Sequence, residues 1–516
     1  MKRNAQPFKS LSRIAFAAFL MAIAWLLNAC GSQPSQQPGP TPMPSLQPTR
    51  TASTEQPFAE EIQETPGQVG NAEMLMNTLS DGGSEEKRAA LEQILITRDE
   101  RYIPVLIELM RAAQIGLVRG VDYNFMITTL ESLSGQALGD DWPAWVTWYG
   151  STNLEPPPGF TGWKGALLAR IDPGFGEFLR DDHPSRIRVE EIQWGGVLVD
   201  GIPALDNPRT IPGEQADYLI AEEPVFGIAL NGEARAYPLR ILDWHEMAND
   251  VVGGVPVSLA YCTLCGAGIA YDGRAPDGNT YTFGSSGFLY RSNKLMYDRQ
   301  TRSLWNQLTG EPVLGELAAS DVRLSLLPVV LTAWSEWLEQ HPDTRVLSLE
   351  TGNRRDYELG AAYGDYFSSE DTMFPVWQRS QELPQKARIY ALRLDGVPKA
   401  YALEKLVTEQ VVNDTLGETP VVLVAQRGSV EVEGENRRVG AVSYNSGGEV
   451  RAYQRGSHTF SPGSQAGRLL DERGGTWKVT EDALVGPDGE KAPRLSGHLA
   501  YWFGWYAFFP NTLIYK

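Results

Sequence analysis

The pattern of apolar and polar residues divides the chain into two parts. Between residues 71 and 150, apolar residues recur every three or four positions, which predicts helices at 84–96, 101–113 and 123–133. From about residue 155 the pattern changes to short β-branched runs separated by Gly, Pro, Asn and Asp, which is typical of strands and turns. The expected fold class is therefore α+β: a small all-α helical cap followed by a β-rich α+β region.

The β-rich region contains an internal duplication. The segment 227–237 aligns with 391–401 at an offset of 164 residues, and the alignment continues without a gap to Pro420-Val421. Each copy has an Asn-Gly or Asp-Gly pair between alternating apolar residues, which is a strong hairpin signal. We expect each copy to form a β-hairpin, a short helix (238–247 in the first copy), a tight turn and a buried strand (255–261 in the first copy).

The helical segments resemble HEAT-type repeats in length and spacing, but two helix pairs are too few for a long solenoid. The expected domain organisation is a signal peptide at 1–29, a disordered tether at 30–70 and a HEAT-like helical cap at 71–150. The first α+β copy follows at 151–385 and the second at 386–516.

The N-terminus predicts export and lipid attachment. A basic start precedes the apolar run 14–27, which is too short for a membrane span and ends before Cys30 in a sequence that resembles a bacterial lipobox. We expect Cys30 to carry a lipid that anchors the protein to a bacterial membrane, with the rest of the chain outside the cytoplasm. The following Pro-, Gln-, Ser- and Thr-rich stretch cannot bury enough apolar surface to fold.

The charge of the chain argues against nucleic acid as a partner. The formal net charge is −19, and loss of the four basic signal residues would make it −23. An acidic protein is repelled by the phosphate backbone and by anionic lipid headgroups. The expected partners are the membrane, through the lipid on Cys30, and a further protein of the cell envelope.

Two cysteines, Cys262 and Cys265, stand three residues apart at the centre of the chain in a Cys-x-x-Cys-Gly motif. Such a pair can bind a metal ion, cycle between dithiol and disulfide, or serve only the structure. The offset of 164 puts Gln426 and Ser429 in their places, so the second copy keeps the scaffold without the cysteines. This difference favours a dedicated function in the first copy.

The metal interpretation needs further ligands. His245 is the preferred third ligand because it ends the helix before the cysteine-bearing strand, and Met296 is a second candidate. Two thiolates with a histidine or thioether suit Cu(I) or Zn(II). The redox interpretation lacks the helix that follows such a motif in thioredoxin, because residues 266–271 read as a turn and a strand.

A second group of residues, Asp298, Arg299, Trp305 and Gln307, is predicted near one end of a strand hairpin. These side chains are candidates for lining a ligand pocket beside the cysteines, and the alternative is a hydrogen-bonded hairpin closed by an ion pair. The chain has no Gly-rich phosphate loop, no Gly-x-Ser-x-Gly elbow and no His-Glu-x-x-His motif. Hydrolytic chemistry therefore has no obvious candidate.

The chain resembles an uncharacterised prokaryotic family, domain of unknown function 3179. The resemblance includes Trp244-His245-Glu246 and the motif from Tyr261 to Gly266, although Thr263 stands where the family often has proline. The other matching segments are 200–203, 234–239, 249–250, 295–299, 303–307, 341–344, 363–366 and 502–510. The family implies no established activity.

Together these features predict a lipid-anchored protein that binds a soft metal ion through the Cys-x-x-Cys-Gly knuckle. A thiol redox or metal-dependent enzyme is the first alternative. An envelope scaffold with structural cysteines is the second.

Overall fold

The computed structural model describes residues 66–516, so the predicted signal peptide and Cys30 lie outside the described residues. Residues 72–516 form one compact unit. The domain borders at 151, 385 and 386 therefore stay predictions. Helix α2 begins at Pro66, inside the predicted tether; proline suits the first turn of a helix because its missing N–H has no partner there.

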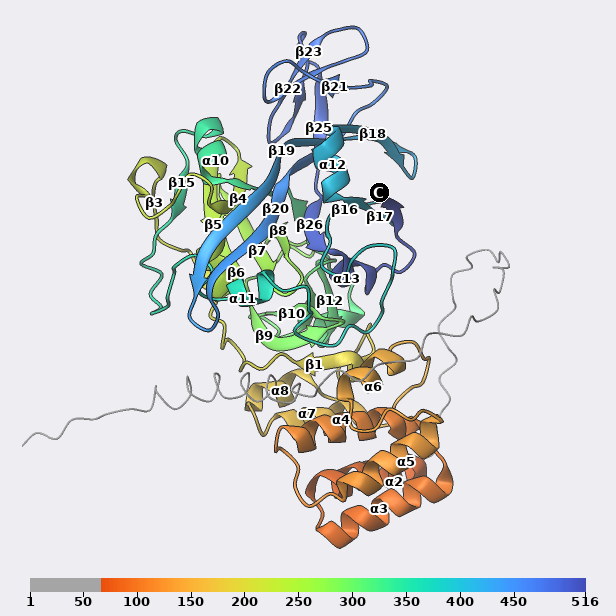
Figure 1. Cartoon of the computed structure of the whole chain (residues 1–516). Coiled ribbons are helices and arrows are strands. Elements are labelled where there is room, and N and C mark those ends of the chain that lie inside the picture. The colour runs from red at the N-terminus through yellow and green to blue at the C-terminus, as the bar shows by residue number, and fades with distance from the viewer. Residues whose placement is uncertain (1–65) are drawn as a thin grey trace, which may run out of the picture. The chain divides into compact units, whose positions relative to one another are not determined.

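The N-terminal part is helical (Figure 1). Its helices are α2 (Pro66–Asp81), α3 (Ser84–Thr97), α4 (Ile103–Gln114), α5 (Tyr123–Ser134), α6 (Trp142–Tyr149), α7 (Phe160–Leu168) and α8 (Pro173–Phe178). The three predicted helices are α3, α4 and α5. Asp122 and Asp141 cap α5 and α6, because each side chain accepts a hydrogen bond from a backbone N–H in the first turn.

Helices α7 and α8 fall where the sequence texture predicted strands and turns. Phe160, Trp163 and Leu167 are buried at helical spacing and join the core of the preceding helices. The many Gly and Pro residues nearby concealed this periodicity in the sequence. No helix within residues 66–516 combines the length and apolarity needed to cross a membrane.

The first copy of the repeat builds two five-stranded sheets, ordered β14-β4-β5-β15-β3 and β13-β8-β7-β6-β2. The elements of the first sheet and its helices are β3 (Thr210–Pro212), β4 (Pro224–Leu230), β5 (Glu233–Pro238), α9 (Leu239–His245), β14 (Val330–Ala333), α10 (Trp334–Gln340) and β15 (Arg345–Leu347). The second sheet contains β2 (Leu205–Asp206), β6 (Met247–Val252), β7 (Val255–Cys262), β8 (Ala267–Asp272) and β13 (Leu326–Leu327). The predicted short helix and buried strand are α9 and β7.

The second copy repeats this topology as β26-β16-β17-β27 and β18-β19-β20-β25, to which β21–β24 are added. Its elements are β16 (Arg388–Leu394), β17 (Val397–Ala402), α12 (Leu403–Glu409), β18 (Val411–Leu416), β19 (Thr419–Asn436), β20 (Gly440–Gln454), β21 (Ser461–Pro462), β22 (Arg468–Leu470), β23 (Thr476–Val479), β24 (Ala483–Val485), β25 (Lys491–Leu495), β26 (His498–Tyr501), α13 (Trp502–Tyr506) and β27 (Leu513–Tyr515). In each copy a strand that follows a helix, β15 after α10 and β27 after α13, pairs in parallel with the second strand of the hairpin.

The duplication extends to single hydrogen bonds. The Asp250 carboxylate accepts hydrogen bonds from Arg235 (2.6 Å) and Tyr237 (2.8 Å), and Asp414 accepts them from Lys399 (2.5 Å) and Tyr401 (2.7 Å). In each copy the indole N–H of a helical Trp, on α10 and on α13, donates at 2.9 Å to the hydroxyl of the Thr seven residues later. These paired interactions confirm the duplication that the sequence predicted.

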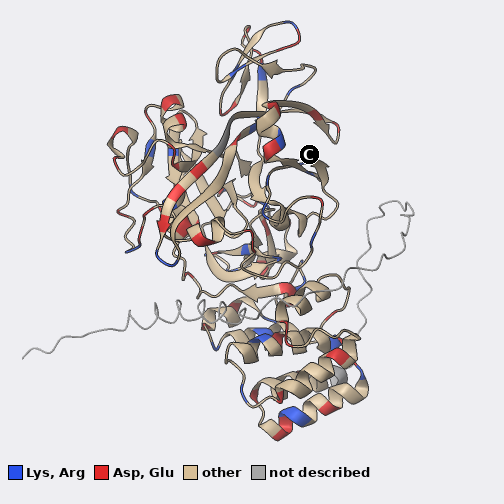
Figure 2. Ribbon diagram, in the orientation of Figure 1, with Lys and Arg blue, Asp and Glu red and all other residues tan. Residues whose placement is uncertain are grey.

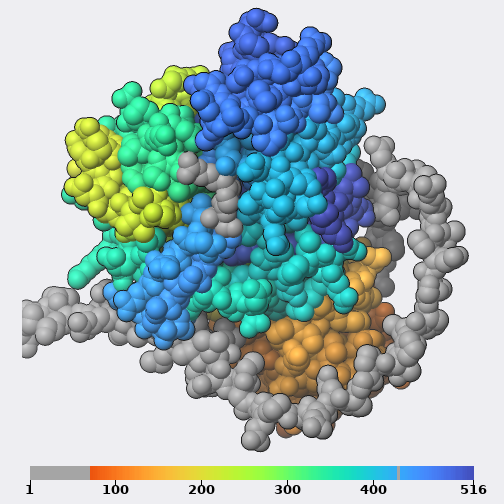
Figure 3. All heavy atoms as spheres, turned by 45° about the horizontal axis from the view of Figure 1, so that its top comes forward, coloured from red at the N-terminus to blue at the C-terminus, as the bar shows by residue number. Residues whose placement is uncertain are grey.

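The copies differ most at the turn that carries the cysteines. Four residues, 263–266, connect β7 to β8, whereas the same place in the second copy holds the 22 residues 427–448. These extend β19 and β20 into a long hairpin arm. The exposed side of the arm carries Glu431, Glu433 and Glu435, while Val432 between them is buried. The arm crosses in front of the first copy in Figure 1, and Figure 3 shows it at the surface.

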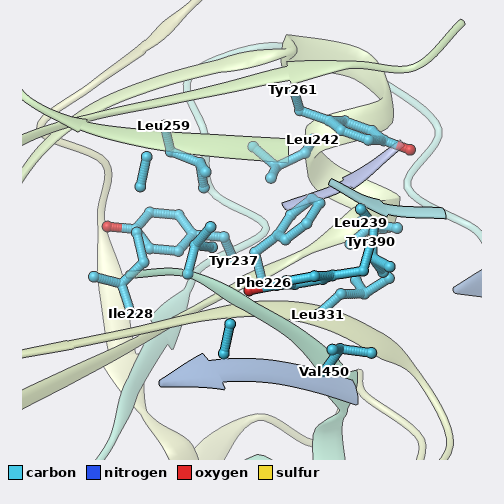
Figure 4. Close-up of a cluster of buried hydrophobic side chains, with 14 of the residues drawn as sticks. Phe226, Ile228, Tyr237, Leu239, Leu242, Leu259, Tyr261, Leu331, Tyr390 and Val450 are labelled. Carbon is cyan, nitrogen blue, oxygen red and sulfur yellow. The ribbon is translucent and has the colours of Figure 1, made fainter. Parts of the chain in front are cut away.

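The hydrophobic core is shared between the copies. Phe226, Tyr237 and Tyr261 of the first copy lie in one buried cluster with Tyr390 and Val450 of the second (Figure 4). A second cluster contains both cysteines together with residues of the arm and of α13. The cysteine turn is therefore enclosed by residues from both copies.

A third five-stranded sheet, β1-β9-β10-β11-β12, is particular to the first copy. It consists of β1 (Ile192–Trp194), β9 (Phe283–Tyr290), β10 (Asn293–Asp298), β11 (Leu304–Asn306) and β12 (Glu311–Leu314). Met296 pairs with Trp305, so the predicted hairpin of these two strands is confirmed.

Figure 2 shows acidic residues over helices and strands alike.

Candidate dithiol site

The cysteine turn is a tight connection that closes the β7–β8 hairpin, with Cys262 paired to Ala267. Gly266 has a φ of 58°, a backbone conformation that favours glycine. A Cβ at Gly266 would lie 2.8 Å from Nη1 of Arg388. The glycine of the motif is thus required both by the backbone angle and by the guanidinium that packs against it.

The two thiols are reduced and buried, with 2% of Cys262 and none of Cys265 exposed. The S–H of Cys265 donates to the carbonyl of Ser292 at 3.0 Å. Gly504 packs against this thiol, because a Cβ there would lie 3.2 Å from Sγ of Cys265. The backbone N–H of Tyr501 donates to the carbonyl of Cys265 at 2.7 Å, which ties the turn to the second copy.

The thiols differ in their electrostatic surroundings. Burial raises the pKa of Cys262, but hydrogen bonds from the Cys265 thiol and from the N–H groups of Lys294 and Cys265 outweigh it, so the pKa falls below its usual value. Burial raises the pKa of Cys265, and the neighbouring Cys262 raises it further. Cys262 is therefore the more acidic of the two thiols, and the single S–H of Cys265, which also faces the carbonyl of Ser292, is the donor between them.

A buried ion pair lies beside the thiols. Glu246 follows α9 in the left-handed conformation, with a φ of 55°. Its carboxylate accepts a hydrogen bond from the hydroxyl of Thr263 at 2.9 Å and forms an ion pair with Nζ of Lys294 at 3.0 Å. Lys294 is also the residue whose backbone N–H donates to Cys262. Sequence reasoning missed both ion-pair residues, and the only signal was that Glu246 follows His245.

His245 has no free ring nitrogen. Nδ1 lies 2.7 Å from the carbonyl of Pro203, so it carries the proton, and Nε2 accepts a hydrogen bond from the hydroxyl of Tyr357 at 2.7 Å. Burial lowers the pKa of His245 to about 4. Within residues 66–516 no three His, Cys, Asp or Glu side chains come together as a metal site. The structure therefore gives His245 a structural role; its predicted role as a metal ligand stays a prediction.

Met296 is fully buried on β10 and belongs to the same hydrophobic cluster as the two cysteines. Its thioether is thus a neighbour of the site in the core. Its role as a ligand also stays a prediction.

The four pocket candidates have separate environments. Asp298 accepts hydrogen bonds from the indole of Trp305 (2.8 Å) and from Thr301, so hydrogen bonds close the β10–β11 hairpin. Arg299 pairs with Asp206 at 2.5 Å. Gln307 donates to the carbonyls at 260 and 267, one on each side of the cysteine turn, both at 2.9 Å. Gln307 is thus hydrogen-bonded to both strands that carry the cysteine turn, and Trp305 lies in the same buried cluster as the cysteines.

A surface hollow of about 390 Å³ is lined by residues 204–209 and 350–352. Neither the cysteines nor the four pocket candidates line it, as far as the described residues show. The cysteines instead lie beneath a cover. The hydroxyl of Tyr366, on α11 (Gly364–Phe367), donates to the carbonyl of Leu264 at 2.7 Å.

Comparison with known proteins identifies the family. Residues 199–512 match the family described as "Protein of unknown function (DUF3179)", and this match spans more than half of the chain. The chain belongs to this family, as the resemblance implied. No curated protein and no solved structure matches the chain.

Proposed function

We propose that this member of the DUF3179 family is a thiol redox protein whose Cys262–Cys265 pair exchanges two electrons with a disulfide-bonded substrate. The observation that carries the proposal is the asymmetry of the pair. Cys262 accepts hydrogen bonds from the backbone N–H groups of Lys294 and Cys265, whereas the single S–H of Cys265 is a donor shared between Cys262 and the carbonyl of Ser292. A thiolate beside a protonated thiol is the arrangement that thiol–disulfide exchange requires.

The proposed reaction begins when the Cys262 thiolate attacks one sulfur of the substrate disulfide. The substrate S–S bond breaks, one substrate sulfur leaves as a thiolate that takes up a proton, and a mixed disulfide forms on Cys262. Cys265 then loses its proton, attacks Sγ of Cys262 and releases the second substrate thiol. Two electrons and the Cys265 proton pass to the substrate, the second proton comes from the solvent, and the Cys262–Cys265 disulfide remains.

Both thiols are covered in the structure, so a substrate can reach Cys262 only when the cover moves away. The hydrogen bond from Tyr366 to Leu264 is one of the contacts that must break. We further propose that the protein works outside the cytoplasm, anchored by a lipid on Cys30 and next to another envelope protein. Disulfide chemistry is favoured in that compartment.

A second candidate function is binding of Cu(I) by the two thiolates, with the thioether of Met296 as a third ligand. The observation that favours it is the knuckle itself: two backbone N–H groups point at Cys262, and Gly266 lets the chain turn beneath the sulfurs. Soft sulfur ligands select Cu(I), and among the described residues no set of hard ligands completes a Zn(II) site.

The two functions separate in one experiment on the full-length protein in detergent. The protein is equilibrated without oxygen in mixtures of oxidised and reduced glutathione and then alkylated. Peptide mass spectrometry reads the Cys262–Cys265 pair independently of Cys30. The redox proposal expects one reversible two-electron transition. Metal loading with Cu(I) or Zn(II), followed by metal analysis, tests the second candidate.

The single-cysteine variants provide matched controls for each other. Cys265→Ser is expected to trap a mixed disulfide between glutathione and Cys262, whereas Cys262→Ser should react at least about tenfold more slowly because the Cys265 thiol stays protonated. Thiols that stay reduced in every mixture, with no mixed disulfide in Cys265→Ser, would contradict the redox proposal. One bound Cu(I) that both variants lose would support the second candidate.

A further inference from the structure

We infer that Glu246 and Lys294 are positioning residues whose buried ion pair sets the reduction potential of the Cys262–Cys265 pair. This inference rests on the proposed redox function. It concerns residues that do not themselves react and that act through the thiols.

The ion pair joins the two segments that hold the thiols. Glu246 binds the hydroxyl of Thr263, which stands between the cysteines, at 2.9 Å. The ammonium of Lys294 lies 3.0 Å from the Glu246 carboxylate, and the backbone N–H of the same residue, the second of β10, donates to Cys262. Ser292, two residues earlier, accepts the hydrogen bond from Cys265. The Glu246–Lys294 pair therefore positions the segment that supplies the N–H donor to Cys262 and the carbonyl acceptor for Cys265.

Stability alone does not account for this pair. Both side chains are buried, with 8% of the Glu246 side chain and 5% of the Lys294 side chain exposed. Removing two charges from water is costly, and apolar side chains of similar size are often as stabilising.

The second copy has no charged residue at the position of Glu246. Gln410 occupies the position of Glu246, with a φ of 63° in the same left-handed region. The backbone therefore does not need a carboxylate there, and the first copy has one beside its cysteines.

The two charges act on the Cys262 thiolate with opposite signs. The carboxylate of Glu246 disfavours a second negative charge nearby, and the ammonium of Lys294 favours it. Glu246→Gln leaves the ammonium unopposed, which stabilises the thiolate and hence the reduced pair. Lys294→Met leaves the carboxylate unopposed and stabilises the oxidised pair instead.

The test measures the reduction potential of the full-length protein and its variants in glutathione mixtures. Glu246→Gln is expected to shift the equilibrium constant about tenfold toward the dithiol, which raises the potential by about 30 mV. Lys294→Met is expected to shift it about tenfold toward the disulfide. The double variant should return to within about threefold of the wild type, because both charges are absent.

Two further variants keep the test decisive if a single variant fails to fold. Glu246→Asp keeps the charge and is expected to stay closer to the wild-type potential than Glu246→Gln. Gln410→Glu adds a carboxylate at the matching position of the second copy, away from the cysteines, and is expected to leave the potential unchanged.

The outcomes distinguish this inference from the proposed function. A wild-type pair without a reversible transition overturns the proposed function. A normal wild-type transition, with both single variants shifting the potential in the same direction or by less than twofold, overturns the role of the ion pair. Shifts of the potential that are opposite in the two single variants and cancel in the double variant support this role. A general loosening of the fold would shift the potential of both single variants in the same direction.

Discussion

His245→Ala is expected to destabilise the protein without disturbing the chemistry of the cysteines. The substitution removes the imidazole that joins Pro203 to Tyr357. Two hydrogen bonds are lost, and the part-buried carbonyl of Pro203 loses this partner, whereas the hydroxyl of Tyr357 keeps its hydrogen bond with Thr351. With a net value of about 1 kcal/mol for each bond and about 1 kcal/mol more for the unpaired carbonyl, the free energy of unfolding should fall by about 3 kcal/mol near pH 7.5.

The pH dependence of the free energy of unfolding provides a second, independent value to test. The pKa of His245 is about 4 in the folded protein and 6.5 in the unfolded chain, because burial disfavours the charged ring. As the pH falls below 6.5 the unfolded chain takes up the proton first, so the wild type loses stability down to about pH 4. One pKa unit corresponds to 1.36 kcal/mol, so the loss from this residue is about 3 kcal/mol.

The assay is urea unfolding, followed by tryptophan fluorescence, of wild type and His245→Ala at several pH values between 4 and 7.5. The free energy of unfolding of the variant should lie about 3 kcal/mol below that of the wild type at pH 7.5. This difference should shrink as the pH falls, because the variant has no ring to protonate. Tyr357→Phe is the matched control. It keeps the imidazole and removes one hydroxyl, so we expect a loss of about 1 kcal/mol at pH 7.5.

A His245→Ala protein that is as stable as the wild type at pH 7.5, or whose loss of stability grows as the pH falls, would contradict the structural role of His245. Metal binding supplies a further check. A wild type that binds one Cu(I), beside a His245→Ala protein of unchanged stability that binds none, would identify His245 as a ligand and contradict the structural role.

Two further predictions use matched positions of the fold. Asp250→Asn should cost about 3 kcal/mol of stability, because it leaves the buried Arg235 without its main partner, while Asp414→Asn in the more exposed second copy should cost about half as much; urea unfolding compares them. Gly266→Ala should both destabilise the protein and change the rate at which Cys262 reacts with a maleimide, because the new Cβ meets a guanidinium. Gly254→Ala, with a φ of 76° and open space around its Cα, should cost only about 1 kcal/mol and leave the thiol rate unchanged; equal rates in the two variants would argue against the packing described for the turn.

The parts of the fold that the sequence predicted are those set by residues close together in the chain. Asn231 and Asp395 each have a φ of 50° in tight hairpin turns, as the Asn-Gly and Asp-Gly pairs predicted. The offset of 164 residues holds in the strand registers, since Met247 pairs with Ala260 as Val411 pairs with Val424. Turn chemistry and strand alternation depend on a few neighbouring residues, so they can be read from a single sequence.

The surroundings of the thiols depend on residues far apart in the chain, and the sequence does not reveal them. Glu246 and Lys294 are separated by 48 residues and meet only after two different sheets have packed. His245 was expected to face the cysteines because it ends the preceding helix, but its ring nitrogens are bonded to Pro203 and Tyr357. Proximity along the chain did not predict the direction of the side chain.

The long arm of the second copy makes each half of the duplication incomplete without the other. Gene duplication usually yields two modules that can drift apart or be recombined, but here one half holds the thiols and the other closes the space around them. A fragment that stops before residue 388 would leave the thiols open to air oxidation and would leave apolar side chains such as Phe226 and Tyr261 without part of their packing. The two halves are therefore expected to be gained, lost and inherited together.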